Sequence, residues 1–159
     1  MKHFPSLMGF LAVVFMISAA SSVVTMPAVS SWYETIHKPS WTPPDWVFGP
    51  VWTFLYLLIA ISGWLMWKKL PGTFLERFAH SAMVPYWLQL ALNFAWSIIF
   101  FGFGQFILAA INIVVMLAAI AWNIAAFHKI DAKAAGLLIP YLLWVLYAST
   151  LNIGIVVLN

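Results

Sequence analysis

The side chains best suited to chemistry in this chain are aromatic rings and amides, rather than acids, bases or thiols. Segment 32–56 reads WYETIHKPSWTPPDWVFGPVWTFLY and combines closely spaced tryptophans with four prolines. Proline restricts the backbone, and indole rings offer large, rigid apolar surfaces. A plain connector between two helices needs neither feature. The segment therefore predicts a rigid aromatic lid over a flat hydrophobic ligand.

Aromatic and amide side chains also recur on one face of each of three predicted helices. At about 100° per residue, each set falls on a single helix face. From a rise of about 1.5 Å per residue, we expect Trp52, Asn93 and Asn152 at a shared depth, roughly 9–12 Å below the surface that carries segment 32–56. This lining suits a ligand with a flat apolar body and a few polar edges. The three sets are Phe48, Trp52 and Tyr56; Gln89, Asn93, Trp96 and Phe100; and Tyr141, Trp144, Ala148 and Asn152.

Simpler interpretations fit other polar and aromatic residues. Side-chain amides in membrane helices often hydrogen-bond across helices, and we expect this structural role for Asn112 and Asn123. Tryptophans at the ends of membrane spans often form an interfacial belt. We expect that belt to include Trp32, Trp64 and Trp67.

Common catalytic and metal-binding patterns are missing from the sequence. There are no cysteines, which excludes disulfides and thiolate chemistry. Neither a Ser-His-Asp set nor a pair of carboxylates is recognisable, which argues against a hydrolase. The histidines lie near predicted span ends and not at ligand spacing, so no metal site is predicted. They are His3, His37, His80 and His128.

The composition requires a membrane environment. Of 159 residues, 65% are hydrophobic and 7% are charged, and the mean hydropathy is +1.00. A soluble domain of this size needs far more polar surface, and apolar runs of about 18 residues or more predict membrane spans. We expect an all-α integral membrane protein, a single domain over 1–159 with the proline- and tryptophan-rich first loop as a lid. Its bundle of five transmembrane helices is predicted at about 7–26, 46–67, 82–101, 106–127 and 135–158.

The ends of the predicted helices carry recognisable signals. Thr42 is expected to cap the second helix, because threonine is a good N-cap and Pro43 suits the first helical position. Pro50, Pro85 and Pro140 fall inside predicted helices, where each removes a backbone donor and predicts a bend or a free carbonyl. The first apolar run is longer than the core of a cleaved signal peptide, so we expect it to remain as a helix.

The placement of charge predicts orientation and limits the possible energy sources. Basic residues concentrate on the cytoplasmic side of membrane proteins, so we expect a cytoplasmic N-terminus and no nucleic-acid partner. No ionisable residue lies well inside a span, which argues against an ion-coupled carrier, and no phosphate-binding loop motif is present. Lys38 is alone on the outer side, and the inner side holds Lys2, Lys68, Lys69, Arg77, Lys129 and Lys133.

Several segments together resemble a known family signature. They are Trp32-Tyr33, Lys38-Pro39-Ser40-Trp41-Thr42-Pro43-Pro44, Phe48-Gly49-Pro50-Val51-Trp52-Thr53 and Tyr56, then Asn93-Phe94-Ala95-Trp96 with Phe100-Phe101-Gly102, and Pro140-Tyr141-Leu142-Leu143-Trp144 with Leu151-Asn152. This pattern is similar to that of the translocator protein family, also called the tryptophan-rich sensory protein or peripheral benzodiazepine receptor family. The resemblance covers nearly the whole chain.

The resemblance implies a five-helix bundle, often dimeric, with a pocket closed by the first loop. It implies binding of protoporphyrin IX, related tetrapyrroles and isoquinoline carboxamide or benzodiazepine-type drugs, with porphyrin as ligand and no required cofactor. Bacterial members are linked to light- and oxygen-dependent porphyrin breakdown, and the resemblance would assign catalytic roles in it to Trp52 and Trp144. The predicted ligand-binding residues are Trp41, Phe48, Trp52, Tyr56, Asn93, Trp96, Phe100, Trp144, Ala148 and Asn152.

Three functions remain open at this point: a tetrapyrrole sensor or scavenger with photo-oxidative breakdown, a passive transporter of tetrapyrroles or similar molecules, and a regulatory scaffold. Ala91 and Ala95 form a small-xxx-small pair that suits a homodimer contact. No Lys or Arg follows Tyr147, so the C-terminal sterol motif of mitochondrial members is absent. This absence favours a bacterial member in the cell membrane.

Overall fold

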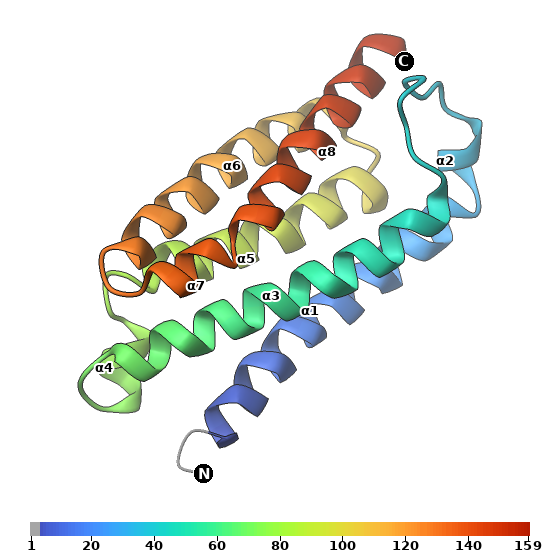
Figure 1. Cartoon of the computed structure of the whole chain (residues 1–159). Helices are drawn as coiled ribbons and strands as arrows, with labels where there is room; N and C mark the ends of the chain where they lie inside the picture. Colours follow the sequence, from blue (N-terminus) through green and yellow to red (C-terminus); the bar gives the residue numbers. More distant parts are fainter. Residues whose placement is uncertain (1–3) are drawn as a thin grey trace.

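The computed structural model describes residues 4–159 and shows an all-helical bundle with five helices long and apolar enough to cross a membrane. The long helices lie side by side along one diagonal axis (Figure 1). They are α1 (Phe4–Val29), α3 (Phe48–Lys69), α5 (Val84–Ser97, continued by the π-turn η2, Ile98–Gly102), α6 (Phe106–His128) and α8 (Ile139–Leu158). Shorter elements connect them: α2 (Trp32–Thr35), the 3₁₀ turn η1 (Asp45–Val47), α4 (Phe74–Phe78) and α7 (Ala132–Gly136).

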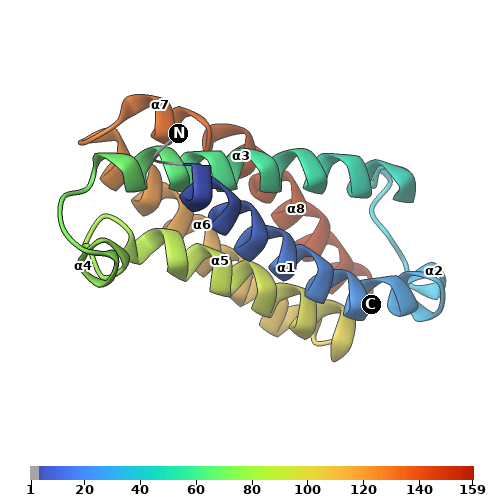
Figure 2. The same ribbon diagram turned by 90° about the horizontal axis from the view of Figure 1, so that it is seen from below.

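The helices form a closed ring in the order α1, α3, α8, α6, α5. Figure 2 shows α1 lying between α3 and α5, and α6 and α8 complete the ring behind them. The centre is filled by large side chains such as Ile59, Tyr86, Ile120 and Tyr141, all fully buried. α8 packs mainly on α6 and touches α3 at few points, so the α3–α8 contact is the loosest seam of the ring.

The helix ends differ from the predicted ones where prolines cluster. Thr42 is not an N-cap: η1 begins at Asp45, and the Thr42 hydroxyl is buried with no hydrogen-bond partner among residues 4–159. A residue before proline avoids the helical region, so the Pro43-Pro44 pair delays the helix. Pro50 lies in the first turn of α3. Pro85 and Pro140 are each the second residue of a helix, where a missing donor costs little, so they mark helix starts rather than bends.

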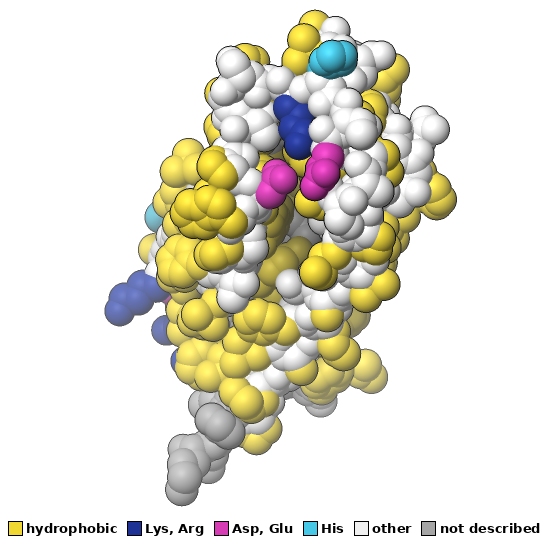
Figure 3. Space-filling view, turned by 90° about the vertical axis from the view of Figure 1, so that its right-hand side faces the viewer, with side chains coloured by type: hydrophobic (Ala, Val, Ile, Leu, Met, Phe, Trp, Pro, Cys, Tyr) yellow, Lys and Arg dark blue, Asp and Glu magenta, His cyan; other side chains and the backbone are white. Residues whose placement is uncertain are grey.

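Charged side chains gather at the two ends of the bundle. At the end formed by α2, the first loop and η1, acidic and basic side chains lie side by side above a hollow in the surface (Figure 3). That segment contains Glu34, Lys38 and Asp45. Lys2 lies outside the described residues. The opposite end, around α4 and the α6–α7 connection, carries Lys68, Lys69, Arg77, Lys129 and Lys133.

Candidate functional site

The centre of the bundle contains a hydrogen-bonded cluster of one amide and two phenols. The Tyr56 hydroxyl on α3 donates to Asn93 Oδ1 on α5 at 2.7 Å, and Asn93 Nδ2 donates to the Tyr141 hydroxyl on α8 at 3.2 Å. The Tyr141 hydroxyl donates in turn to Met116 Sδ at 3.6 Å. Asn93 is 3% exposed, so its amide is satisfied by these neighbours rather than by water. The cluster therefore ties α3, α5 and α8 together.

Aromatic rings form one wall of this central cluster. The Trp52 ring lies 5.3 Å from the Tyr56 ring and 6.3 Å from the Tyr141 ring, between centroids. Phe48, one turn before Trp52, meets the Trp144 ring edge-on at 5.9 Å. Such tilted and edge-on pairs each contribute about 0.5–1.5 kcal/mol beyond buried area. The structure thus brings together five of the predicted residues: Phe48, Trp52, Tyr56, Asn93 and Trp144.

A second cluster lies closer to the first loop. Trp96 Nε1 donates to Asn152 Oδ1 at 3.1 Å, and Asn152 Nδ2 donates to the Phe106 carbonyl oxygen at 3.0 Å. The Trp96 ring stacks on Phe100 with centroids 5.0 Å apart. Three more of the predicted residues, Trp96, Phe100 and Asn152, are therefore grouped here, whereas Ala148 is half-buried against the main core.

The predicted common depth of these residues is wrong. Trp52 contacts Tyr141, whereas Asn152 lies eleven residues later on α8, about 16 Å farther along the helix. The reason is the chain path, because segment 36–44 has little regular structure and runs beside the last turns of α8 before α3 begins. The two clusters form successive tiers: the central tier around Asn93 and the upper tier around Asn152, which is nearer the first loop. Asn93 and Trp96, one turn apart on α5, join the two tiers.

A π-turn shapes the upper tier. The Phe103 N–H donates to the Ile98 carbonyl oxygen at 3.0 Å, a five-residue step that widens the end of α5. Adjacent residues of a regular α-helix point about 100° apart, yet both Phe100 and Phe101 pack on Trp96, the second edge-on at 5.8 Å. The wide turn therefore supplies two aromatic rings where an α-helix would supply one.

The first loop is fastened to the outer side of α8. The His37 N–H donates to Asn159 Oδ1 at 3.0 Å, and Asn159 Nδ2 donates to the His37 carbonyl at 2.9 Å. The Tyr147 hydroxyl donates to the Trp41 carbonyl at 2.6 Å, and Trp41 Nε1 donates to Thr150 Oγ1 at 3.3 Å. Trp41 is 53% exposed. The structure therefore does not bring Trp41 together with the other predicted site residues.

Of the three tryptophans expected in an interfacial belt, Trp67 is buried inside the protein instead, whereas Trp32 and Trp64 are half-buried. Trp32 on α2 is half-buried, with its ring 5.7 Å from that of Phe106 in the upper tier. Trp67 is buried edge-on against Phe10 at 5.6 Å. Trp64 is half-buried under the Lys68 ammonium, 3.5 Å from its ring centroid. The short helices α2 and α4 pack around these span ends. This packing could not be predicted from the position of the tryptophans in the sequence.

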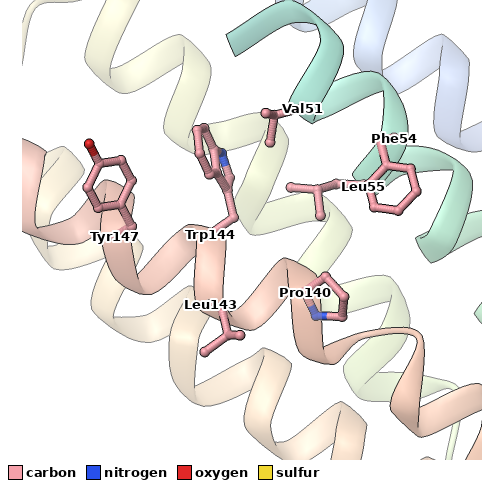
Figure 4. A pocket seen from close by; sticks show the side chains of 7 residues that line it. All are labelled: Val51, Phe54, Leu55, Pro140, Leu143, Trp144 and Tyr147. Atoms are coloured by element: carbon pink, nitrogen blue, oxygen red, sulfur yellow. The ribbon is translucent and has the colours of Figure 1, made fainter. Parts of the chain in front are cut away.

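A groove of about 430 Å³ opens on the outer surface of the bundle at the α3–α8 seam (Figure 4). Trp144 stands on the α8 wall with its indole directed toward α3. Trp144 Nε1 is buried and has no hydrogen-bond acceptor among residues 4–159. The groove volume lies in the range of about 300–1,000 Å³ that holds small ligands. Its lining is nearly all apolar: Val51, Phe54, Leu55, Pro140, Leu143, Trp144 and Tyr147.

At the loop end of the protein, charged side chains lie close to the buried phenol of Tyr33. Burial raises the pKa of Tyr33 to about 12, and the nearby Asp45 carboxylate adds to this shift. Lys38 Nζ lies 4.2 Å from the centroid of the Tyr33 ring. The Tyr33 phenol therefore stays neutral at physiological pH and serves as a platform for the Lys38 cation.

Unlike Asn93, two other buried amides do not bridge helices within the described residues: Asn123 on α6, for which a bridging role was expected, and Gln89 on α5. Asn123 is 0% exposed, and neither of its amide atoms has a partner within residues 4–159. The same holds for both amide atoms of Gln89, and Asn112 Oδ1 is also buried without a partner. Tyr86 stacks on Phe127 at 5.9 Å, so Gln89 and Asn123 each lie about one turn from that contact on antiparallel helices.

One central residue, Tyr141, was absent from the predicted binding set. Its place on the same helix face as Trp144 could have indicated a role in the site. Its hydroxyl accepts a hydrogen bond from the Asn93 amide. Within the part of the chain described, no group of three or more His, Asp or Glu side chains could hold a metal ion.

Comparisons with known proteins give a consistent assignment. Residues 10–158 match the TspO/MBR family. The chain is 38% identical to the tryptophan-rich protein TspO of Archaeoglobus fulgidus over 161 aligned positions, covering 100% of this chain and 97% of that one. It is 43% identical to the human translocator protein, covering 76% and 70% of the two chains. It is 35% identical to the tryptophan-rich sensory protein of Cereibacter sphaeroides, covering 80% and 77%. Relatives thus occur in archaea, bacteria and mammals.

Proposed function

Because the chain belongs to the TspO/MBR family, we propose that it is a membrane receptor for flat tetrapyrroles such as protoporphyrin IX, acting as a sensor or scavenger. The family is linked to tetrapyrrole binding and sensing. The role of this particular chain as a sensor or scavenger is what we propose.

The observation that supports this proposal most is the column of aromatic rings and amides through two tiers. Trp52 and Trp96 offer indole faces on which a porphyrin plane can stack, and Asn93 and Asn152 offer polar contacts for its edge. Tyr56 and Asn93 are packed together in the ligand-free protein. Binding therefore requires these side chains to separate, which exchanges internal hydrogen bonds for contacts with the ligand.

Trp52 and Trp144 are proposed to flank the bound ring during light- and oxygen-dependent breakdown of the porphyrin. No conventional acid–base constellation is needed, because the illuminated porphyrin and dioxygen supply the reactivity. Isoquinoline carboxamide drugs should compete for the same position. We further propose that the protein forms a homodimer. The basic end of the bundle is proposed to face the cytoplasm, in accordance with the charge distribution.

The test is a dark titration of purified protein with protoporphyrin IX, followed by tryptophan quenching, and then illumination in air. Saturable quenching followed by loss of porphyrin absorbance, impaired in Trp52→Phe, would support a breakdown site. Trp122→Phe is the matched control, since Trp122 is half exposed on α6. Without saturable quenching, the receptor proposal fails.

Passive transport of tetrapyrroles is the second candidate. It is favoured by the lack of ionisable side chains in the middle of the described spans, which permits facilitated movement but not ion coupling. The human relative is named a translocator protein. Porphyrin flux into sealed vesicles separates the two functions, because a receptor without a transport role leaves the flux at the level of protein-free vesicles.

A further inference from the structure

The α3–α8 groove lies at the depth of the lipid hydrocarbon. Beyond Tyr147, α8 continues for eleven residues toward the loop end, about 16 Å. Beyond Leu55, α3 continues for fourteen residues toward the basic end, about 21 Å. The hydrocarbon core of a bilayer is about 30 Å thick. A groove centred between these limits faces acyl chains rather than water.

One side chain, Trp144, lies between the groove and the central tier. Trp144 lines the groove and also meets Phe48 edge-on at 5.9 Å, and Phe48 lies one turn from Trp52. The buried Trp144 Nε1 lacks an acceptor in residues 4–159, although an indole N–H in an apolar setting normally has one. A ligand with an acceptor on its edge would satisfy this donor.

The two possible routes to the central tier are closed by different forces. Four hydrogen bonds fasten the first loop to α8, through His37, Trp41, Tyr147, Thr150 and Asn159. The α3–α8 seam within the groove is closed by apolar side chains, apart from Tyr147 at its edge, whose hydroxyl belongs to the fastening of the loop. Lipid tails replace apolar contacts at little cost, whereas hydrogen bonds lost near the membrane have to be replaced. The seam is therefore the easier of the two to open.

We propose that the α3–α8 groove is a membrane-facing vestibule through which a flat apolar ligand with an edge acceptor passes from the bilayer to the central tier. Trp144 binds the edge of the ligand through Nε1 and turns to admit it. This inference rests on the proposed function, since it supplies the route to that site. The occupant is a tetrapyrrole dissolved in the bilayer.

The cysteine-free chain allows a direct test. Leu143 is 60% exposed at the groove, and Ile153, 49% exposed on the same helix, lines a separate groove between α6 and α8. Leu143→Cys and Ile153→Cys, each labelled with a bulky apolar maleimide, form a matched pair. His37→Cys/Asn159→Cys, bridged by a short thiol crosslinker, locks the loop. Protein in nanodiscs is mixed in the dark with liposomes carrying protoporphyrin IX, and stopped-flow tryptophan quenching gives the rates.

Labelled Leu143→Cys should slow association and dissociation at least tenfold, with Kd unchanged within about threefold. Labelled Ile153→Cys and the locked loop should remain within about twofold of the unmodified protein. Normal rates in labelled Leu143→Cys, or loss of association in the locked loop, would overturn the vestibule while leaving the receptor proposal intact. No saturable quenching in the unmodified protein would overturn the receptor proposal and the vestibule with it.

Discussion

Gly154 is the point at which α8 and the first loop come closest together. A Cβ added there would overlap Pro39 Cγ and lie 3.5 Å from Trp41 Cζ2. Carbon atoms normally sit about 3.5–4.0 Å apart, and the proline ring cannot rotate away, so relief requires the backbone to move by about 1 Å. Overpacking of this kind costs about 1–3 kcal/mol. Gly154→Ala should therefore lift the loop.

The loop should move rather than α8. The helix is held across α6 by apolar packing and by the Asn152 amide. The loop is held by exposed hydrogen bonds worth about 0.5–1.5 kcal/mol each, of which the 3.3 Å bond from Trp41 to Thr150 is the longest. The free energy of global unfolding should change less than the free energy of opening the loop, because replacing glycine by alanine inside a helix stabilises the helix by up to about 1 kcal/mol.

Hydrogen exchange measures this local effect. Amides of segment 36–42, including the Thr42 N–H that donates to the Pro39 carbonyl at 3.0 Å, should exchange about 5- to 150-fold faster in Gly154→Ala, the equivalent of 1–3 kcal/mol. Gly9→Ala is the control, because a Cβ at Gly9 meets nothing within 4 Å. Unchanged exchange in the loop, or the same acceleration in Gly9→Ala, would refute the reasoning.

Three further predictions follow from the packing and from one carboxylate. In Gly63→Ala the new Cβ would lie 2.5 Å from Tyr86 Cζ, so thermal unfolding should show a loss of about 1–3 kcal/mol; a midpoint equal to that of Gly49→Ala, where nothing lies within 4 Å, would contradict this. Asn123→Leu should leave stability unchanged or raise it by about 1 kcal/mol, because it removes an unpartnered buried amide; a marked loss would reveal a bound water that satisfies it. The Glu76 pKa should lie below its usual 4.5, because the Thr73 backbone N–H and hydroxyl donate to it, so its capping contribution is present above pH 4.5 and is lost as pH falls through the lowered pKa. Carbon-13 NMR of labelled glutamate should show a higher Glu76 pKa in Thr73→Ala, which loses the hydroxyl donor and keeps the backbone N–H; equal values would contradict the contribution of the hydroxyl.

The five long helices could be predicted from sequence because hydropathy and length decide membrane spans almost alone. The clustering of Trp52, Tyr56 and Asn93 could also be predicted, since helical periodicity fixes which residues share a face. Neither inference needs to know how one helix is shifted along another.

The remaining features depend on that shift and on local geometry. The relative height of α3 and α8 is determined by a loop that runs beside α8, which separated Trp52 from Asn152. The π-turn at Ile98–Gly102 adds a residue to one turn, and no residue type in it announces the change. Gln89 and Asn123 have the composition of a bridging pair, but hydrogen-bond geometry has to be met to within a few tenths of an ångström.

The placement of charge at the two ends of the bundle has an electrical consequence. A unit charge moved across the membrane responds to the membrane potential by about 2.3 kcal/mol per 100 mV. The middle of each described span carries no such charge, so a voltage exerts little force on the helices themselves. A tetrapyrrole with ionised carboxylates does carry charge. Under the proposed function, voltage would therefore act on the position of a bound tetrapyrrole rather than on the helices of the protein.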